Sequence, residues 1–257
     1  MTRIVAIVNR KGGVGKTTTA VNLAATLAAA GEKTLLVDFD PQGNATTALG
    51  IHKEESLLTI YDVITGRCTI QEAIQSIIHP GQLGLIPSTA DLSGAEVELV
   101  NAKNREFRLR DRLKPLHQTF DWILIDSPPS LGLLTVNSLA AAHSALIPLQ
   151  CEFLAMEGLS QVIKTIEIIK KQMNKALDIE GILLTLFEPD NPQNIQISRE
   201  VRDHLGPRTF QTTIPRDIPL SAAPGFGRPG VWYHPWSPGA RAYQRLTLEL
   251  LQKENHR

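Results

Sequence analysis

Cysteine, net charge and long apolar runs are all scarce in this 257-residue chain, and each scarcity excludes a class of protein. Cys68 and Cys151 are its two cysteines, and they stand far apart without a CxxC spacing. That usage argues against a disulfide framework or a zinc site and favours a reducing compartment. The formal net charge is zero, so any basic surface for nucleic acid has to be local.

The ends of the chain also lack targeting features. The start, MTRIVAIVNRKGG, has too short an apolar run for a signal peptide, and no stretch of the chain is long enough to cross a bilayer. The end, LTLELLQKENHR, predicts a closing helix but lacks the basic amphipathic run of a membrane anchor. We therefore expect a cytoplasmic protein that does not bind membranes.

What the chain does contain is a regular alternation of strand-like and helix-like segments. Short β-branched apolar runs indicate strands at residues 4–8, 34–37, 83–86, 122–125, 145–149 and 181–187. Helical spacing indicates helices at residues 17–30, 57–65, 91–117 (one long or two short) and 156–177. This alternation predicts one α/β domain over residues 1–257, with a mostly parallel sheet flanked by helices on both faces. The Pro- and Gly-rich residues 223–238 are expected to form an ordered surface loop or edge.

A glycine-rich segment between the first strand and the first helix predicts a phosphate-binding loop. Residues 8–19 read VNRKGGVGKTTT. The glycines let backbone N–H groups turn toward phosphate oxygens, and the following helix adds its N-terminal dipole. Lys16 supplies a positive charge for the β- and γ-phosphates, and Thr17 supplies a hydroxyl ligand for Mg²⁺. The alternative, a structural turn with an incidental lysine, fits this motif poorly.

The loop departs from the common pattern GxxxxGK(S/T) at its first position. Arg10 stands where that pattern has glycine, and Lys11 follows it. A second lysine in a phosphate loop has to meet negative charge or point into solvent. From the loop alone, the two possibilities are equally supported.

Further segments resemble the ParA/Soj branch of the deviant Walker ATPases. The resemblance rests on KGGVGKTT, on LLVDFDPQGNAT at residues 35–46 and on ILIDSPPSLG at residues 123–132. Residues 86–99, 148–161 and 214–229 are similar to the same branch, so the likeness covers nearly the whole chain. It implies a three-layer P-loop NTPase fold that uses ATP and Mg²⁺ and hydrolyses ATP to ADP and phosphate.

The resemblance also assigns roles to single residues. It implies that Lys11 reaches across an ATP-bridged homodimer to the partner's nucleotide, acting like an arginine finger. Asp40 matches the residue that positions or deprotonates the attacking water, and Asp126 the acid that holds Mg²⁺ directly or through its water shell. The role of Asp38 stays open, because at a strand end it can simply orient the loop. The segment predicted to bind the nucleotide comprises Lys11, Gly12, Gly13, Val14, Gly15, Lys16, Thr17 and Thr18.

The three acids have a structural alternative, since an aspartate after a strand is often a turn former or helix cap. However, the carboxyl ends of parallel strands are where such sheets bind ligands, so three acids there favour a site. Pro215 resembles an adenine-proximal position, and a simple turn explains it equally well.

The resemblance further implies a partitioning switch whose ATP-bound dimer binds DNA nonspecifically and is released by a ParB-like partner. The ATP-bound form would then associate with the nucleoid. Between residues 199 and 245 the chain has seven arginines, no lysine and three acids, a local excess that fits phosphate contact. The candidate DNA contacts are Arg199, Arg202, Arg208, Arg216, Arg228, Arg241 and Arg245. Scattered surface charge is the competing interpretation.

Three residues weaken the DNA prediction, because Pro219, Trp236 and Pro238 stand where relatives commonly have basic residues. Trp232 and Trp236 are more suited to a protein partner. Stacking of nucleic acid on these aromatics is an alternative, but burial against the closing helix explains them better. The alternative function is therefore an ATPase that positions a protein cargo or division machinery with weak or no DNA binding. A membrane-cycling MinD-like role lacks the terminal anchor, and an iron–sulfur reductase needs a second central cysteine beside Cys151. A non-hydrolysing regulator would not need Lys11, Asp40 and Asp126 together.

Overall fold

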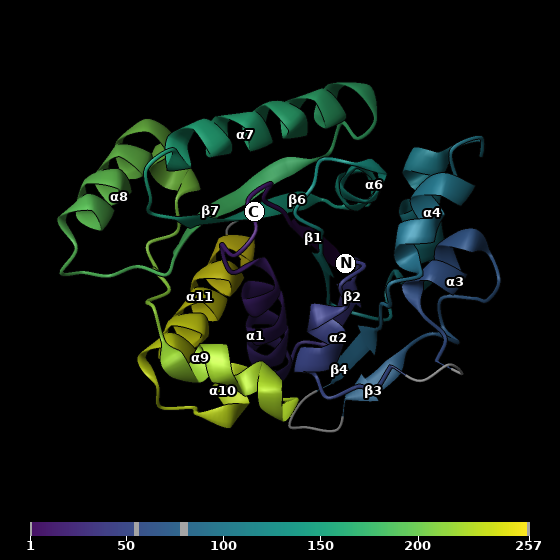
Figure 1. Ribbon diagram of the computed structural model, residues 1–257, viewed down its shortest axis with the longest axis horizontal. Helices are drawn as coiled ribbons and strands as arrows, with labels where there is room; N and C mark the ends of the chain where they lie inside the picture. The colour runs from purple at the N-terminus through teal and green to yellow at the C-terminus, as the bar shows by residue number, and fades with distance from the viewer. Residues whose placement is uncertain (1, 54–56, 78–81, 256–257) are drawn as a thin grey trace.

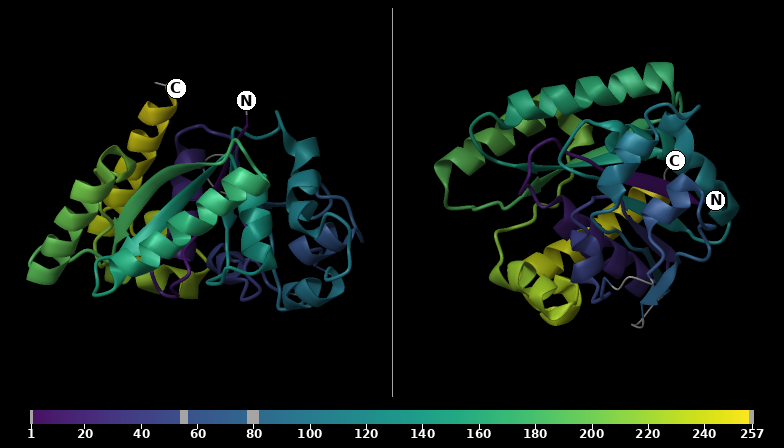
Figure 2. Two further views of the ribbon diagram at one scale, coloured as in Figure 1. Left: turned by 90° about the horizontal axis from the view of Figure 1, so that it is seen from above. Right: turned by 45° about the vertical axis from the view of Figure 1, so that its right-hand side comes forward.

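The computed structural model describes residues 2–53, 57–77 and 82–255 and shows a seven-stranded sheet between two layers of helices (Figures 1 and 2). The strands are β1 (Arg3–Ile7), β2 (Thr34–Asp38), β3 (Gln75–Ile77), β4 (Leu83–Ile86), β5 (Trp122–Asp126), β6 (Ser144–Gln150) and β7 (Asp178–Thr185). Their order is β3-β4-β2-β5-β1-β6-β7, and only the edge strand β3 runs antiparallel to its neighbour. The predicted α/β class with a mostly parallel sheet is confirmed.

Helices cover both faces of this sheet. They are α1 (Lys16–Ala29), α2 (Asn44–Ala48), α3 (Ile60–Thr65), α4 (Leu92–Glu98), α5 (Arg108–Leu113), α6 (Leu133–Ala141), α7 (Ala155–Gln172), α8 (Pro192–Leu205), α9 (Ile218–Ala222), α10 (Gly230–Tyr233) and α11 (Pro238–Asn255). Among the described residues, no helix is both long and apolar enough to cross a membrane.

Side chains of each central strand alternate between two hydrophobic cores. In the first strand, Ile4 and Ala6 pack into one core, with residues of α3 to α8, while Val5 and Ile7 pack into the other, with residues of α1, α2 and α9 to α11. Successive side chains of a strand point to opposite faces, so a strand covered on both sides has to be apolar throughout. This explains why the strands read as continuous apolar runs and why two helical layers form.

The parallel register brings the ends of three strands together at one edge of the sheet. Asp126 at the end of β5 is in register with Ile7 on β1 and with Asp38 on β2. The chain leaves β1 there to form the phosphate loop. Residues far apart in the sequence therefore meet at this edge because the strands between them share one direction.

Several predicted boundaries are corrected by the structure. The predicted helix at 91–117 is two short α-helices, α4 and α5, with 3₁₀ turns after them, so the two-helix alternative is confirmed. The predicted helix at 156–177 ends at Gln172, and the predicted strand at 181–187 is Asp178–Thr185. Helix α3 begins three residues later than predicted, where Thr59 and Asp62 form a capping box.

The prediction of a loop at residues 223–238 is wrong. The segment contains a 3₁₀ turn at Ala223–Phe226, helix α10 and the first residue of α11. Pro219 lies in the first turn of α9, and Pro238 begins α11. Proline suits these positions because the first turn of a helix leaves its N–H groups unpaired. Proline therefore marks the first turns of these two helices.

Candidate functional site

The phosphate loop connects β1 to α1 at the edge where the strand ends meet. Gly13 (φ 76°) and Gly15 (φ 83°) adopt the left-handed conformation, which favours glycine. Gly15 is the N-cap of α1 and no side chain caps this helix, so its first N–H groups remain available to an anion. Thr185 at the end of β7 donates a hydrogen bond from its hydroxyl to the Val14 carbonyl at 2.8 Å, which fixes the loop against the sheet. The loop therefore has the form of an anion-binding site.

Lys16 is a buried cation in this loop. It is 7% exposed, and its Nζ donates to the Lys11 carbonyl at 3.2 Å. Burial lowers the pKa of Lys16, while the nearby carboxylates of Asp126 and Asp40 raise it. Among the described residues it has no ion pair, and a buried charge without a partner is costly. A bound phosphate would give the Lys16 ammonium group a direct anionic partner.

Asp126 is the corresponding buried anion. Its side chain is fully buried, and neither carboxylate oxygen has a hydrogen-bond partner among the described residues, as is also true of the neighbouring Ser127 hydroxyl. Burial, reinforced by the charge of Asp38, raises the pKa of Asp126 well above its ordinary value. The Thr17 hydroxyl approaches this carboxylate without reaching hydrogen-bond geometry and partly offsets the increase. An orphaned carboxylate beside a hydroxyl matches the hard oxygen ligands of Mg²⁺.

Asp38, whose role the sequence left open, is occupied by structural hydrogen bonds. Its Oδ2 accepts from the backbone N–H of Thr46 at 2.8 Å and from the Thr46 hydroxyl at 2.7 Å. Burial raises the pKa of Asp38 to about 6, against the lowering effect of these bonds. Thr46 also accepts from the Ser88 N–H, so the network joins β2, α2 and the segment after β4. The geometry therefore favours the interpretation that Asp38 orients the loop after β2.

Asp40 lies on that loop and faces the same centre. It is 6% exposed, and its Oδ1 accepts from the backbone N–H of Gln42 at 2.9 Å. Its charge acts on both Lys16 and Asp126, because it raises the pKa of each. The structure thus brings Lys16, Asp40 and Asp126 together beside the phosphate loop, as the sequence predicts.

Lys11 instead points away from its own phosphate loop. It is exposed, and its Nζ forms an ion pair with Glu152 in the turn between β6 and α7. Its backbone N–H donates to the Asn9 Oδ1 at 3.0 Å, while the Asn9 amide donates to the Pro148 carbonyl at 2.6 Å. Neither Asn9 nor Glu152 was predicted from the sequence. Asn9 could have been found as a polar residue directly after an apolar strand, whereas nothing in the sequence of the phosphate loop indicates its contact with Glu152.

Pro215, the predicted adenine-proximal residue, lies opposite Phe187 across an isolated β-bridge. Pro215 is half-buried, and the next residue, Arg216, forms an ion pair with Glu188. Its bridge partner Phe187 follows the end of β7, the strand that also contributes Thr185 to the phosphate loop. The position is thus on the same edge of the sheet as the loop.

The predicted DNA contacts do not form one cluster. Arg199 and Arg202 lie on α8 and Arg208 lies in the 3₁₀ turn after it, whereas Arg241 and Arg245 lie on α11. Figure 1 shows α8 and α11 on opposite sides of the sheet. Trp232 packs partly against the second core, as expected for burial, but Trp236 is 75% exposed. The arginine excess of the sequence is therefore divided between two surfaces.

The cysteines are not placed to hold a cluster. Cys151 is buried in the first core, and burial raises the pKa of its thiol to about 11. Cys68 lies half-buried beside that core. A protonated, buried thiol is a poor metal ligand, which disfavours the iron–sulfur alternative.

Comparisons with known proteins agree with this geometry. The family model described as an AAA domain matches residues 2–179. The chromosome partitioning protein ParA of Myxococcus xanthus is 52% identical over 98% of this chain and 89% of its own length. The sporulation initiation inhibitor protein Soj of Bacillus subtilis is 46% identical over 97% of this chain and 98% of its own length.

Solved structures are similar over comparable lengths. Cobyrinic acid a,c-diamide synthase from Mycobacterium smegmatis, with bound ADP and magnesium, has a TM-score of 0.87 at 35% identity, covering 99% of this chain and 96% of that chain. The septum site-determining protein MinD of Pyrococcus horikoshii, complexed with Mg-ADP, has a TM-score of 0.81 at 28% identity, covering 97% of this chain and 96% of that chain.

Proposed function

Because this chain belongs to the ParA/Soj family of partitioning ATPases, we propose that it is a switch that binds MgATP, dimerises around it and hydrolyses it. The observation that carries the proposal is the separation of the two loop lysines. Lys16 is buried beside Asp40 and Asp126, while the exposed Lys11 is turned outward and held by Glu152. A cation on the outside of its own site is positioned to serve the site of a second copy.

In this proposal each residue has a defined task. The loop N–H groups and Lys16 bind the β- and γ-phosphates, with Thr17 and Asp126 holding Mg²⁺. When bound there, Mg²⁺ would supply positive charge that offsets the negative charge of these phosphates. Asp40 orients the attacking water and accepts its proton. Lys11 leaves Glu152 and stabilises negative charge on the partner's transferring phosphoryl group, the task of an arginine finger.

The dimer supplies a two-state switch. ATP bound at an interface stabilises only the dimer, so it shifts the population toward that state. We infer that the ATP dimer binds DNA nonspecifically and that a ParB-like partner stimulates hydrolysis and release, in chromosome or plasmid partitioning. The arginines on α8 and α11 support this proposal, because neutralised phosphates release counterions.

Positioning of a protein cargo or division machinery, with weak DNA binding, is a second candidate function. It is favoured by Pro219 and Pro238, which lie in the first turns of α9 and α11 where the resemblance implies basic residues, and by the exposed Trp236. Exposed aromatic residues are enriched at protein interfaces.

Replacing Asp40 with alanine separates ATP binding from hydrolysis. We expect ATP affinity to change by no more than about twofold and the hydrolysis rate to fall at least about a hundredfold, since a positioned base contributes on that order. Titration calorimetry and phosphate release measure the two quantities. The matched control is Asp190→Ala, which deletes an exposed carboxylate in the loop after β7. Normal turnover in Asp40→Ala would show that another group positions the water.

The same variant tests the cellular function, because it holds the ATP state in place. We expect it to bind a nonspecific DNA duplex with ATP but not with ADP, and more weakly at high salt. Duplex binding by fluorescence anisotropy at two salt concentrations provides the measurement. If the protein forms ATP-dependent dimers that do not bind DNA at either salt concentration, the partitioning proposal is ruled out and the protein-cargo alternative is favoured.

A further inference from the structure

An exposed surface around α10 combines aromatic rings with arginines. The aromatic–arginine patch consists of Phe226, Arg228, Tyr233, Trp236 and Arg241. Phe226 is 63% exposed, Tyr233 is 36% exposed and Trp236 is 75% exposed. Leaving three large rings in water is unfavourable, so such a patch indicates a binding surface.

The patch is positively charged, and the segment of the chain that forms it contains no acidic residue. From residue 218 to residue 248 the chain has three arginines and neither aspartate nor glutamate. The preceding acid, Asp217, is buried, and its carboxylate accepts the Gly239 N–H at 2.6 Å. An anionic partner therefore meets no repulsion from residues 217–248.

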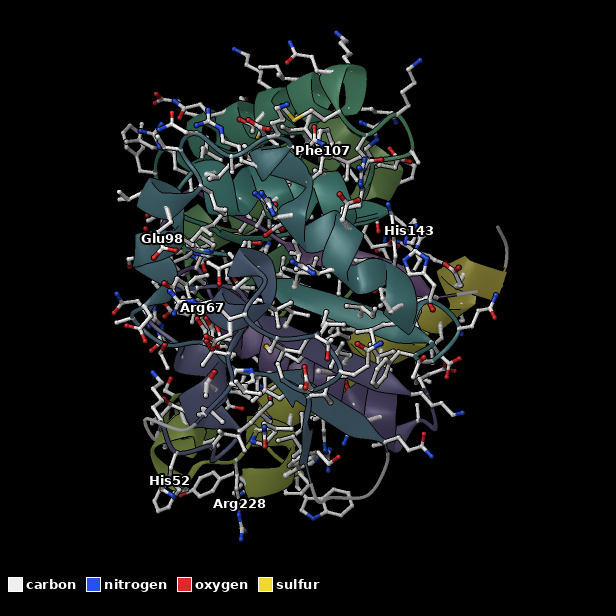
Figure 3. All side chains as sticks on the ribbon, turned by 90° about the vertical axis from the view of Figure 1, so that its right-hand side faces the viewer. His52, Arg67, Glu98, Phe107, His143 and Arg228 are labelled. Carbon is white, nitrogen blue, oxygen red and sulfur yellow. The ribbon has the colours of Figure 1, made fainter. Side chains whose placement is uncertain are left out.

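Two further basic side chains lie at its rim. The backbones of Gly50 and Gly227 touch so closely that a Cβ on Gly50 would lie 2.9 Å from the Gly227 carbonyl. This contact brings together the segments that carry His52 and Arg228, and Figure 3 shows both side chains at the same end of the molecule. The exposed Lys53 follows His52 in the chain. Lys53 thus carries a charge of the same sign as the arginines of the patch.

The rings are arranged as platforms with open faces. Phe226 and Tyr233 stack on each other with centroids 4.8 Å apart and planes inclined by 20°. The guanidinium of Arg241 lies over the Trp236 ring, 5.8 Å from its centroid. An exposed ring with a cation on one face can accept another flat ring on its other face.

A hydrogen-bonded path joins the patch to the phosphate loop. The Asn22 amide donates to the Thr18 carbonyl at 2.8 Å, and the Asn22 Oδ1 accepts the Val231 N–H of α10 at 3.0 Å. Between the same elements lies a cavity of about 250 Å³ lined by Thr17, Thr18, Arg228 and Gly230, among others. A movement of the loop around a nucleotide can therefore be transmitted to α10.

We propose that the aromatic–arginine patch binds single-stranded nucleic acid by stacking unpaired bases on Trp236 and on the Phe226–Tyr233 pair, with the arginines on phosphates. The proposal rests on the nucleic-acid binding proposed above and adds how the bases are bound, by stacking on exposed aromatic rings. Flat rings recognise the faces of bases, and a duplex hides those faces within its own stack. An acidic protein segment would satisfy the arginines but has no comparable use for stacked, open rings.

The test compares a twenty-nucleotide oligothymidine with a duplex of the same length, using ATPγS and fluorescence anisotropy. We expect Trp236→Ala to weaken oligothymidine binding about tenfold and duplex binding no more than about twofold. Trp236→Phe, which retains a ring, is expected to keep most of the affinity. Ile168→Ala, which removes an exposed apolar side chain on α7, is the matched control and is expected to change neither.

The outcomes separate this inference from the proposed function. Duplex binding with no effect of Trp236→Ala on oligothymidine overturns the stacking mode and leaves the partitioning proposal intact. Failure of both nucleic acids to bind overturns both. Binding of poly-glutamate in place of oligothymidine, lost in Trp236→Ala, would assign the patch to an acidic protein segment and also overturn the proposal.

Discussion

Replacing Lys16 with alanine is expected to abolish ATP binding, with an affinity loss of at least about a hundredfold. Lys16 is the buried cation beside the loop glycines, and its ammonium group meets only the Lys11 carbonyl among the described residues. Without it, the γ-phosphate would enter a site whose nearest side-chain charges are the carboxylates of Asp40 and Asp126. The variant therefore loses the attraction between Lys16 and the phosphates and keeps the repulsion between the phosphates and the two carboxylates.

Titration calorimetry with ATP and Mg²⁺ measures this effect directly. Lys33→Ala is the matched control, because it removes an exposed lysine before β2. This variant is expected to bind ATP with wild-type affinity. Circular dichroism would show whether Lys16→Ala is folded. A folded Lys16→Ala protein with wild-type ATP affinity would show that the phosphates bind elsewhere.

Replacing Lys11 with alanine is expected to leave ATP binding intact but to remove ATP-dependent dimerisation, with hydrolysis falling about a thousandfold or more. The reason is again its position. Its side chain is exposed and pairs with Glu152 rather than pointing into its own phosphate loop. An exposed ion pair contributes little to stability, so the contact can break when a partner's nucleotide offers a stronger anion.

Light scattering with and without ATP measures dimerisation in this variant. Arg10→Ala removes the neighbouring exposed cation, which bonds to Gln161 on α7, and is expected to dimerise normally. Unchanged ATP-dependent dimerisation in Lys11→Ala would dismiss a role for this lysine across the interface.

The parts of the site that the sequence predicts are those fixed by local geometry. A Gly-rich turn between a strand and a helix has few possible conformations, and Gly13 and Gly15 adopt the left-handed ones. The convergence of Asp40 and Asp126 also follows from the sequence, because parallel strands end at one edge. Both inferences need only the direction of the strands.

Contacts that depend on side-chain packing could not be predicted in this way. Glu152 follows Lys11 by 141 residues, and nothing near either residue indicates that they meet. The seven arginines are close in the sequence, but α8 and α11, which carry four of them, lie on opposite sides of the sheet. The helices at residues 223–238 were missed because proline and glycine indicate loops on average, whereas here they occupy helix starts and caps.

Mixing two inactive variants tests whether Lys11 of one chain completes the ATP site of another. In a mixed dimer of Lys11→Ala and Asp40→Ala, the first chain keeps its own Asp40 and receives Lys11 from the second. Phosphate release by the equimolar mixture is predicted to rise well above that of either variant alone, because each mixed dimer retains one Lys11 across the interface and has one complete site. About a quarter of the wild-type rate is the reference value, since pairing at random would make half of the dimers mixed. A mixture as inactive as its two components would show that Lys11 does not complete the partner's site and acts in its own.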